Sequence, residues 1–261
     1  MAKRRIDTLL AERGLAGSRT AAAESVRAGR VRIGVDGPFA VKPGQLVAED
    51  ADLRVAEPQP YVSRGGIKLA NALDALGIDP AGRDCLDVGA STGGFVDCLL
   101  KRRAARVIAL DVARGQLDWG LRNDPRVHVI EGRNARDLDP PELPFEPSLV
   151  TVDASFISLA KLLGALGVCV PPGGDLLGLV KPQFELEPRR VGKGGVVRSA
   201  EDRRAALRSA AKAATAAGLA VRGFASSGLP GPKGNRETFI WCRTGGEAVA
   251  DLEAAIAGVE P

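Results

Sequence analysis

The chain contains only one histidine, His128, among 261 residues. A serine or cysteine hydrolase normally needs a histidine base beside its nucleophile, and a histidine-ligated zinc site needs more than one histidine. Both classes of protein are therefore disfavoured. The four cysteines are widely spaced and form no C-x-x-C pair, so we expect buried free thiols and no metal site.

Long apolar runs are also missing. The longest extends from Ala154 to Pro171, but Ser155, Ser158 and Lys161 interrupt it, and it is shorter than the ~20 apolar residues that a membrane helix needs. The first residues, MAKRRIDTLLAERG, are charged throughout and contain no apolar signal core. We therefore expect a cytoplasmic protein that has no membrane partner.

The composition is that of an ordinary globular protein, with 45% hydrophobic and 26% charged residues. The formal net charge of +4 is unevenly distributed: residues 1–32 hold eight Lys/Arg and three Asp/Glu, which gives +5 and leaves −1 for the rest. Such a basic end favours a polyanionic partner. A pair of solvated charged helices is the alternative explanation of this charge.

The N-terminal residues predict two short helices. Ile6, Leu9 and Leu10 recur at helical spacing, and Gly14 follows where a left-handed helix end is expected. Ser18 can cap a second helix that extends over residues 19–28 and stops at Gly29.

A β-hairpin is predicted to follow the two helices. Val31, Ile33 and Val35 alternate with other residues, Asp36-Gly37 supplies a turn, and residues 39–42 would form the returning strand. This order of elements, with the motif R-x-D-x-L-L-x-x-R-G-L-x-x-S-R, resembles the S4 RNA-binding domain. The resemblance implies an RNA partner whose phosphates are contacted by basic side chains around the helices, namely Arg4, Arg5, Arg19, Arg27 and Arg30.

A second module is predicted beyond a short linker that contains Pro58 and Pro60. We expect a small α+β domain over residues 1–54, the linker over residues 55–62 and a catalytic domain over residues 63–261. In the larger domain, apolar strand-like runs alternate with helical segments, which predicts a doubly wound α/β fold with a parallel sheet. The expected strands are 85–88, 106–110, 127–130, 149–152, 176–180, 220–225 and 238–243, with a helix over 200–217.

A glycine-rich loop, L-D-V-G-A-S-T-G-G over residues 86–94, follows the first of these strands and opens a helix. Ser91 replaces the second glycine of the dinucleotide fingerprint. This makes an NAD-dependent oxidoreductase a less favoured interpretation without excluding it. Asp111 ends the next strand, where a carboxylate can bind ribose hydroxyls, although Asp87 and Asp111 could instead cap local structure. The loop resembles the first motif of class I methyltransferases, which implies S-adenosylmethionine as cofactor and these binding residues: Asp87, Gly89, Ala90, Ser91, Gly93, Gly94, Asp111, Asn134 and Asp153.

Four ionisable residues should meet in this architecture: Lys68, Asp153, Lys181 and Glu237. Any one alone could be an ordinary solvated residue. Together they suit methyl transfer to a ribose hydroxyl, which must lose its proton or be held with a lone pair aimed at the methyl carbon. A lysine can act as base when burial and a neighbouring cation lower its pKa. We assign that role to Lys181, with Asp153 orienting it and complementing the sulfonium, and Lys68 and Glu237 positioning the ribose.

Six motifs in order now resemble the TlyA family from residue 5 to residue 243: S-R-G-G-x-K-L, G-A-S-T-G-G, G-Q-L, D-x-S-F-I-S, L-V-K-P-Q-F and G-P-x-G-N-x-E. The K-D-K-E set is similar to that of FtsJ-like ribose methyltransferases. The resemblance implies 2′-O-methylation of cytidine in 16S or 23S ribosomal RNA within ribosomal subunits, without an obligate protein partner, and adds Arg64 as an RNA contact. Arg114 stands where the family usually has a tyrosine.

Two other functions remain as alternatives. A membrane-acting haemolysin would need a secretion signal or an amphipathic cationic helix, and neither is evident. A non-catalytic RNA-binding assembly factor would not require the intact set of four ionisable residues. The Gly- and charge-rich stretch between Pro182 and Ser199 is expected to be a mobile substrate loop, or else an ordinary surface loop.

Overall fold

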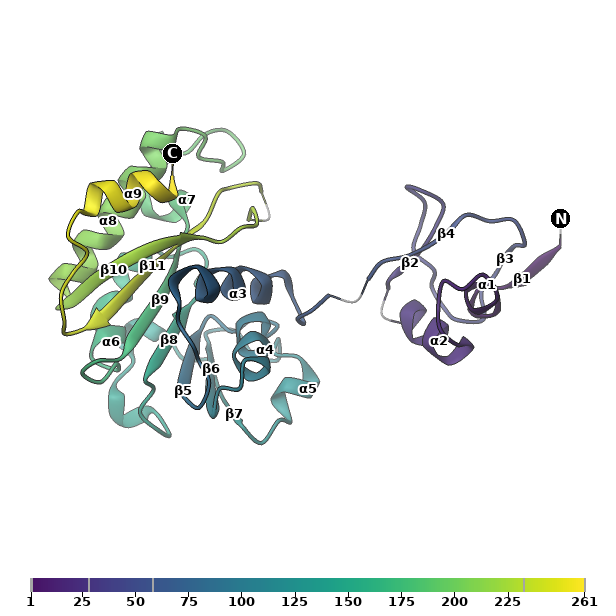
Figure 1. Cartoon of the computed structure of the whole chain (residues 1–261), viewed down its shortest axis with the longest axis horizontal. Helices are drawn as coiled ribbons and strands as arrows, with labels where there is room; N and C mark the ends of the chain where they lie inside the picture. Colours follow the sequence, from purple (N-terminus) through teal and green to yellow (C-terminus); the bar gives the residue numbers. More distant parts are fainter. Residues whose placement is uncertain (1, 28, 58, 232, 261) are drawn as a thin grey trace. The chain divides into compact units, whose positions relative to one another are not determined.

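A computed structural model describes residues 2–27, 29–57, 59–231 and 233–260. The chain divides into two compact units, Met1–Gln59 and Pro60–Pro261 (Figure 1). Three predicted positions, Ala28 at the end of the second helix, Pro58 in the linker and Pro232 in the last motif, lie outside the described residues.

The first unit contains the two predicted helices, α1 (Ile6–Glu12) and α2 (Arg19–Arg27). The Ser18 hydroxyl accepts a hydrogen bond from the Ala21 N–H at 3.1 Å, as a capping residue should, and Gly14 adopts a left-handed φ of +69° just after α1. Two small antiparallel sheets complete the unit, β1 (Lys3–Arg5) with β3 (Leu46–Ala48) and β2 (Val31–Ile33) with β4 (Leu53–Val55). One apolar cluster, which includes Ile6 and Leu10, lies between the helices and these strands.

The predicted hairpin is confirmed in part. Residues 38–40 return beside β2: Arg32 and Phe39 form an antiparallel bridge, the Ile33 N–H donates to the Pro38 carbonyl at 3.0 Å, and the Ala40 N–H donates to the Val31 carbonyl at 2.8 Å. The returning segment forms no longer strand, and β4, which was not predicted, pairs with β2 as well. Ala40 and Leu53 are each 5% exposed whereas Val41 is 85% exposed, so the pairing with the returning segment ends where its side chains leave the core.

Pro60, Tyr61 and Val62 belong to the second unit. The Val62 N–H donates to Asp97 Oδ2 at 2.9 Å, and Lys101 Nζ donates to the Pro60 carbonyl at 2.7 Å. Both acceptor and donor side chains are on α4 (Gly94–Lys101), so these three residues are anchored to the first helix after the glycine loop.

The second unit is built on a seven-stranded sheet in the order β10-β11-β9-β8-β5-β6-β7. Strand β11 runs antiparallel to both of its neighbours, β10 and β9, and the other strand pairs of the sheet are parallel. All seven strands were predicted to within one residue at each end, and the predicted α/β class is confirmed. The strands are β5 (Asp84–Val88), β6 (Arg106–Asp111), β7 (Val127–Glu131), β8 (Leu149–Val152), β9 (Asp175–Val180), β10 (Leu219–Ser226) and β11 (Thr238–Thr244).

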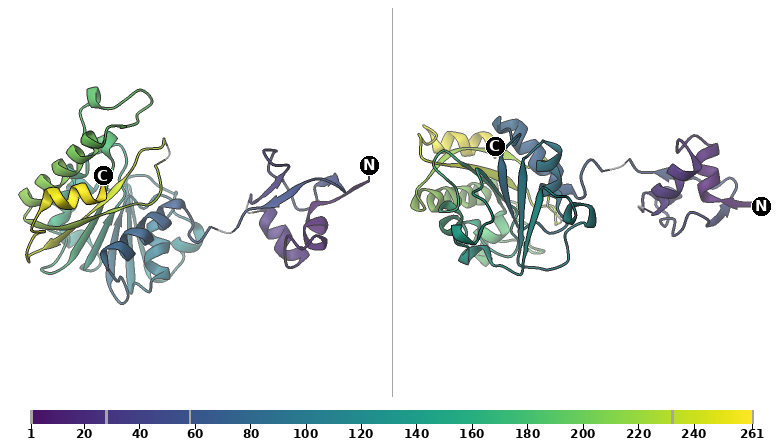
Figure 2. Two further views of the ribbon diagram at one scale, coloured as in Figure 1. Left: turned by 45° about the horizontal axis from the view of Figure 1, so that its top comes forward. Right: turned by 90° about the horizontal axis from the view of Figure 1, so that it is seen from below.

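Helices cover both faces of this sheet (Figure 2). Alternate strand residues point to opposite faces, so that Cys85 and Val107 join one apolar cluster and Leu86 and Ile108 join the other. The first cluster contains α3 (Arg64–Leu76), α4 and α5 (Trp119–Arg122); the second contains α6 (Leu163–Gly167), α8 (Ala200–Ala216) and α9 (Leu252–Val259). The short helix α7 (Pro182–Glu185) follows β9 directly, and 3-10 turns lie in the connections: η1 (Ala135–Asp137), η2 (Pro140–Glu142), η3 (Leu159–Lys161) and η4 (Pro188–Arg190).

The four cysteines are buried and unpaired, as predicted. Burial raises the pKa of the Cys85 thiol to about 12, which keeps it protonated. Across the described residues, no helix has the length and apolar character needed to cross a membrane.

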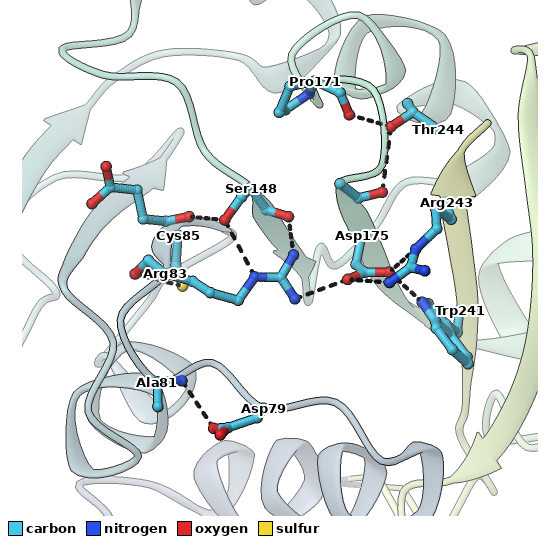
Figure 3. Close-up of polar contacts among 12 residues, drawn as sticks. Asp79, Ala81, Arg83, Cys85, Ser148, Pro171, Asp175, Trp241, Arg243 and Thr244 are labelled. Carbon is cyan, nitrogen blue, oxygen red and sulfur yellow. Dashed lines mark hydrogen bonds and ion pairs between the residues drawn. The ribbon is translucent and has the colours of Figure 1, made fainter. Parts of the chain in front are cut away.

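A polar cluster holds together the amino-terminal edge of the sheet around Asp175, the first residue of β9 (Figure 3). Its carboxylate accepts hydrogen bonds from Trp241 Nε1 at 2.8 Å, Arg243 Nε at 2.9 Å and Arg83 Nη1 at 2.8 Å. Asp175 is 1% exposed, so these donors compensate a charge that is out of contact with water. The glycine loop and the segments next to it lie at the opposite, carboxyl-terminal edge of the parallel strands.

Candidate active site

The glycine loop leaves the carboxyl end of β5 and passes close to the end of β8. Gly89 has a φ of +84°, and a Cβ added there would lie 2.7 Å from the carbonyl oxygen of Asp153. A side chain at this position would therefore collide with the backbone. Further along, Ser91 also has a positive φ, +48°, and its N–H donates to Asp111 Oδ2 at 2.7 Å.

Asp111 connects this loop to the segment after β6. Its second oxygen accepts a hydrogen bond from the Ala113 N–H at 2.8 Å. The Asp111 carboxylate thus caps local backbone groups, which was one of the two roles that the sequence allowed for it. It also lines a cavity of about 380 Å³ at the ends of β5, β6 and β8, and the predicted cofactor residues found in its wall are Gly89, Ser91, Asp111, Asn134 and Asp153.

Two of the predicted cofactor residues have structural roles: Asn134, which also lines that cavity, and Gly93, which does not. The Asn134 side-chain oxygen accepts the Arg136 N–H at 3.1 Å and so caps the turn η1. Gly93 has a φ of +97°, and a Cβ added there would lie 2.3 Å from Leu121 Cδ1, because the loop packs against α5 at this point. Gly93 therefore allows close packing behind the loop.

A second cavity, of about 390 Å³, shares Gly89, Ser91 and Asp153 with the first. Asp87, which is 1% exposed, lines it. Thr151 Oγ1 donates to Asp87 Oδ1 at 2.8 Å, whereas Oδ2 has no hydrogen-bond partner among the described residues. Burial raises the pKa of Asp87 to about 8, and the neighbouring carboxylates of Asp153 and Asp111 add to the effect. The predicted residues in the wall of this cavity are Arg64, Lys68, Asp87, Gly89, Ala90, Ser91, Gly94 and Asp153.

The four ionisable residues form two buried ion pairs. Lys181 Nζ lies 2.6 Å from Asp153 Oδ1 and donates to Ser155 Oγ at 2.9 Å, and Lys68 Nζ is bonded to Glu237 Oε2. Both lysines are 7% exposed and Glu237 is 2% exposed. Charges at this depth are stable only when they are paired, so each lysine is fixed by a carboxylate from a distant part of the sequence.

The pairs come together because strands that lie apart in the sequence end at one edge of the sheet. Lys181 follows β9, Asp153 follows β8, Lys68 is on α3 and Glu237 precedes β11. A third cavity, of about 320 Å³, is lined by Lys181 and Glu237, and Asp153 and Lys68 line the Asp87 cavity. The arrangement places two amines and two carboxylates beside the glycine loop.

Three supporting residues were not among the predicted site residues. A Cβ added at Gly231 would lie 2.3 Å from Glu237 Oε1, so the glycine leaves room for the carboxylate. Phe156 has a φ of +64° and is 92% exposed, with its ring 5.5 Å from that of Phe184. Sequence motifs contain Ser155, Phe156 and Gly231, but only the structure shows that Ser155 bonds to Lys181 and that Phe156 lines two of the cavities.

Glu185 connects the segment after β8 to the helix α7. Its carboxylate accepts hydrogen bonds from Ser158 Oγ at 2.5 Å and from the Leu159 N–H at 2.6 Å. Burial raises the pKa of Glu185. The segments that carry Asp153 and Lys181 are therefore joined a second time, behind the ion pair.

The arginines predicted to contact RNA have different surroundings. Arg5 and Arg19 both bond to Asp7, and the hydrogen bond from Arg5 is the main reason that the pKa of Asp7 falls to about 2. Arg27 is exposed and has no hydrogen-bond or ion-pair partner among the described residues. Arg4 pairs with Glu12 and Glu49, Arg30 donates to Ser25 Oγ, and Arg64 of the second unit donates to the Pro230 carbonyl.

Arg114, which stands in place of the family tyrosine, lies beside Gly132. A Cβ added at Gly132 would be 2.5 Å from Arg114 Nη2, and Gly132 itself has a φ of +74°. Arg114 is not among the residues that line the cavity with Asp111, although Ala113 and Gln116 on either side are.

The sheet order, with one antiparallel strand next to the edge and a glycine loop after the first strand of the sheet's parallel core, defines a class I methyltransferase. A family model for FtsJ-like methyltransferases matches residues 61–244, and a model for the S4 domain matches residues 4–34. The chain belongs to the FtsJ-like methyltransferase family, within its TlyA group, and carries an S4 domain.

Relatives and a solved structure agree with this assignment. A 16S/23S rRNA (cytidine-2′-O)-methyltransferase, TlyA of Mycobacterium tuberculosis, is 50% identical over 94% of this chain and 91% of its own length. YqxC of Bacillus subtilis, named as an rRNA methyltransferase, is 39% identical over 94% of this chain and 87% of its own length. A Streptococcus thermophilus protein described as a hemolysin has the same fold, with a TM-score of 0.74 and 35% identity over 99% of this chain and 96% of that one.

Proposed function

We propose that this enzyme transfers a methyl group from S-adenosylmethionine to the ribose 2′-hydroxyl of a cytidine in ribosomal RNA. The observation that supports it most directly is the pair of buried contacts, Lys181 with Asp153 and Lys68 with Glu237, beside a glycine loop. The name of the 50% identical relative supplies the cytidine, the ribose position and the 16S/23S RNA. The intact site favours an enzyme over a non-catalytic assembly factor.

The residues around the glycine loop fit S-adenosylmethionine. The unpartnered Asp87 Oδ2 suits the cationic amino group of the methionine part, since a nearby cation stabilises the ionised carboxylate. Gly89 leaves room for close approach of the ligand, and Asp111 retains lone pairs for ribose hydroxyls. Asn134 would lie near the adenine. When bound, this cofactor supplies an electrophilic methyl group on a sulfonium.

The residues of the chain prepare the acceptor. The ion pair with Asp153 and the hydrogen bond to Ser155 hold the Lys181 amine in place. After Lys181 has released its own proton to solvent, Nζ accepts the proton of the 2′-hydroxyl as the methyl group is transferred. Lys68 and Glu237 position the ribose from the other side of the site. Lys68, Lys181 and Glu237 are shielded from water, which strengthens the electrostatic interactions among these groups, whereas Asp153 is partly exposed.

In this proposal the first module binds the RNA. We assign RNA binding to residues 1–54, connection to residues 55–62 and catalysis to residues 63–261, with ribosomal subunits as the substrate. The basic residues near the N-terminus would hold phosphates, which position RNA without reading its sequence. Arg64 would add a contact beside the catalytic cavity, which it lines.

Transfer of a labelled methyl group to ribosomal subunits that lack the modification tests the proposal. The wild type should label RNA, and Lys181→Ala should lower kcat by about 100-fold or more while cofactor affinity changes little, because a positioned base contributes about that factor. Lys212→Ala, an exposed lysine on α8, is the matched control and should behave as wild type. Cofactor binding without any transfer by the wild type would indicate a binding or assembly role instead.

A further inference from the structure

Asn235 lies between the predicted substrate loop and the segment that carries Glu237. The side chain is polar and only 1% exposed. Asn235 Oδ1 accepts the Val197 N–H at 2.8 Å, and Asn235 Nδ2 donates to the Gly195 carbonyl at 2.7 Å. One amide thus bonds to two backbone groups of a loop that is about 40 residues away in the sequence.

The pattern of these bonds requires an amide. Asn235 offers one acceptor and one donor to a backbone N–H and a backbone carbonyl. An aspartate of the same shape would direct a carboxylate oxygen at the Gly195 carbonyl, which is also an acceptor. A buried polar group that loses its partner is costly, so the two bonds are specific to asparagine.

Within the described part of the chain, few other hydrogen bonds hold the loop over residues 191–197. The Val191 N–H donates to the Pro188 carbonyl at 3.1 Å, the Gly192 N–H to the Val196 carbonyl at 3.2 Å and the Gly195 N–H to the Gly192 carbonyl at 3.0 Å. Gly194 and Gly195 have φ values of +83° and +80°, which other residues adopt with strain. Val197 is 3% exposed and provides the apolar anchor. The amide of Asn235 therefore determines where the glycine-rich part of this loop lies.

The same segment holds a member of the proposed catalytic set. The Gly231 N–H donates to the Asn235 carbonyl at 2.8 Å, and this turn brings Gly231 against the carboxylate of Glu237. Glu237 in turn is paired with Lys68. The 320 Å³ cavity is lined by residues of four segments. They include Ser155 after β8, Lys181 after β9, Val191 and Gly195 of the 191–197 loop, and Asn235 and Glu237 before β11.

We propose that Asn235 is a positioning residue that holds the 191–197 loop as a wall of the compartment for the acceptor nucleotide. This inference rests on the proposed RNA methyl transfer. The nucleotide is confined between the loop and Lys181, so release of the loop weakens its binding. The cofactor cavity at Asp111 shares none of these loop residues and is unaffected.

Asn235→Asp is the variant that tests this role, with Arg236→Ala as the control at an exposed neighbouring position outside the cavity. KM for RNA and kcat would be measured with ribosomal subunits, and cofactor affinity by calorimetry. We expect KM for RNA to rise about tenfold, which is the scale of two lost hydrogen bonds, with cofactor affinity within twofold of wild type. Tryptic cleavage after Lys193 should accelerate in Asn235→Asp and stay at the wild-type rate in Arg236→Ala.

A second variant reaches the same loop without changing Asn235. Gly195→Ala places a side chain at a φ of +80° and should give the same pattern of raised KM for RNA and faster cleavage at Lys193. Unchanged kinetics in both variants despite faster cleavage would overturn the inference. So would a fall in kcat alone that matches Glu237→Gln, because Asn235 would then serve Glu237 and not the loop. An inactive wild type would refute the proposed function instead.

Discussion

Asp87 is the residue whose charge depends most clearly on its surroundings. Its pKa is raised to about 8 by burial, against roughly 3.9 for an aspartate in an unfolded chain. Between about pH 4 and 8 the folded protein keeps a proton that the unfolded chain has lost. The stabilisation from this group is therefore full below about pH 4 and is lost as the pH rises toward 8.

We predict that Asp87→Asn flattens this part of the pH dependence of stability and weakens cofactor binding by tenfold or more. The amide cannot ionise to meet a cation, so both effects share one cause. The melting temperature from pH 5 to 8 and cofactor titration measure them. Asp79→Asn, at an exposed loop position, serves as the control, and an unchanged pH slope in Asp87→Asn would contradict the assignment.

At this scale the sequence predicted which residues meet at the site but not the protonation of Asp87. Lys68, Asp153, Lys181 and Glu237 were identified because motif spacing and strand ends mark them. The pKa of Asp87 depends first on its burial and then on Thr151, Asp153 and Asp111, which other strands bring close to it. Asn235 was in a predicted motif, but its partners Gly195 and Val197 are known only once the two segments meet.

At the scale of elements, β9 depends on the cluster at its first residue, Asp175 (Figure 3). We predict that Asp175→Asn lowers the free energy of unfolding by about 2–3 kcal/mol, because charge-assisted hydrogen bonds from Arg83 and Arg243 lose their charged acceptor. Urea denaturation measures the change. Burial opposes the arginines, but the net effect is a lowered pKa of Asp175. The stabilisation that Asp175 gives the fold is therefore present above about pH 4 and is lost as the pH falls below that value.

The pair between Arg106 and Asp84 is the comparison for Asp175. These side chains are 50% and 25% exposed, so Asp84→Asn should cost less than about 1 kcal/mol. Equal losses in the two variants would show that the Asp175 cluster adds nothing beyond an ordinary surface pair.

Strands of the second unit were predictable because a parallel sheet covered on both faces gives continuous apolar runs. The pairing of β2 with β4 was not predictable in this way. Each of these strands has three residues, and Leu53 of β4 joins the core beside Ala40 of the predicted hairpin only once the unit is folded. The helix α9 was not predicted either. Its Ile256 is fully buried against α8, a contact that its short local pattern does not reveal.

At the scale of the whole molecule, positive charge is concentrated at one end of the first unit. Residues 1–32 carry +5, whereas the remainder of the chain carries −1. The sequence predicted this division because basic residues and a helix-pair motif are local features. It could not show which arginines are already neutralised, since Asp7, Glu12 and Glu49 reach them only in the folded unit.

This difference among the arginines leads to a prediction on salt dependence. If the basic residues near the N-terminus hold RNA phosphates, the logarithm of RNA affinity falls linearly with the logarithm of salt concentration, by about 0.7–0.9 per phosphate contact. Arg27 is exposed and Arg5 is bonded to Asp7 in the protein. Arg27→Gln should therefore reduce the slope by nearly one contact, and Arg5→Gln by less, because Arg5 must first give up part of its bond to Asp7. Filter binding to ribosomal RNA from 50 to 300 mM salt measures both slopes. A larger loss of slope in Arg5→Gln than in Arg27→Gln would mean that RNA displaces the Asp7 pair, and that the contact surface lies around α1 and not at the end of α2.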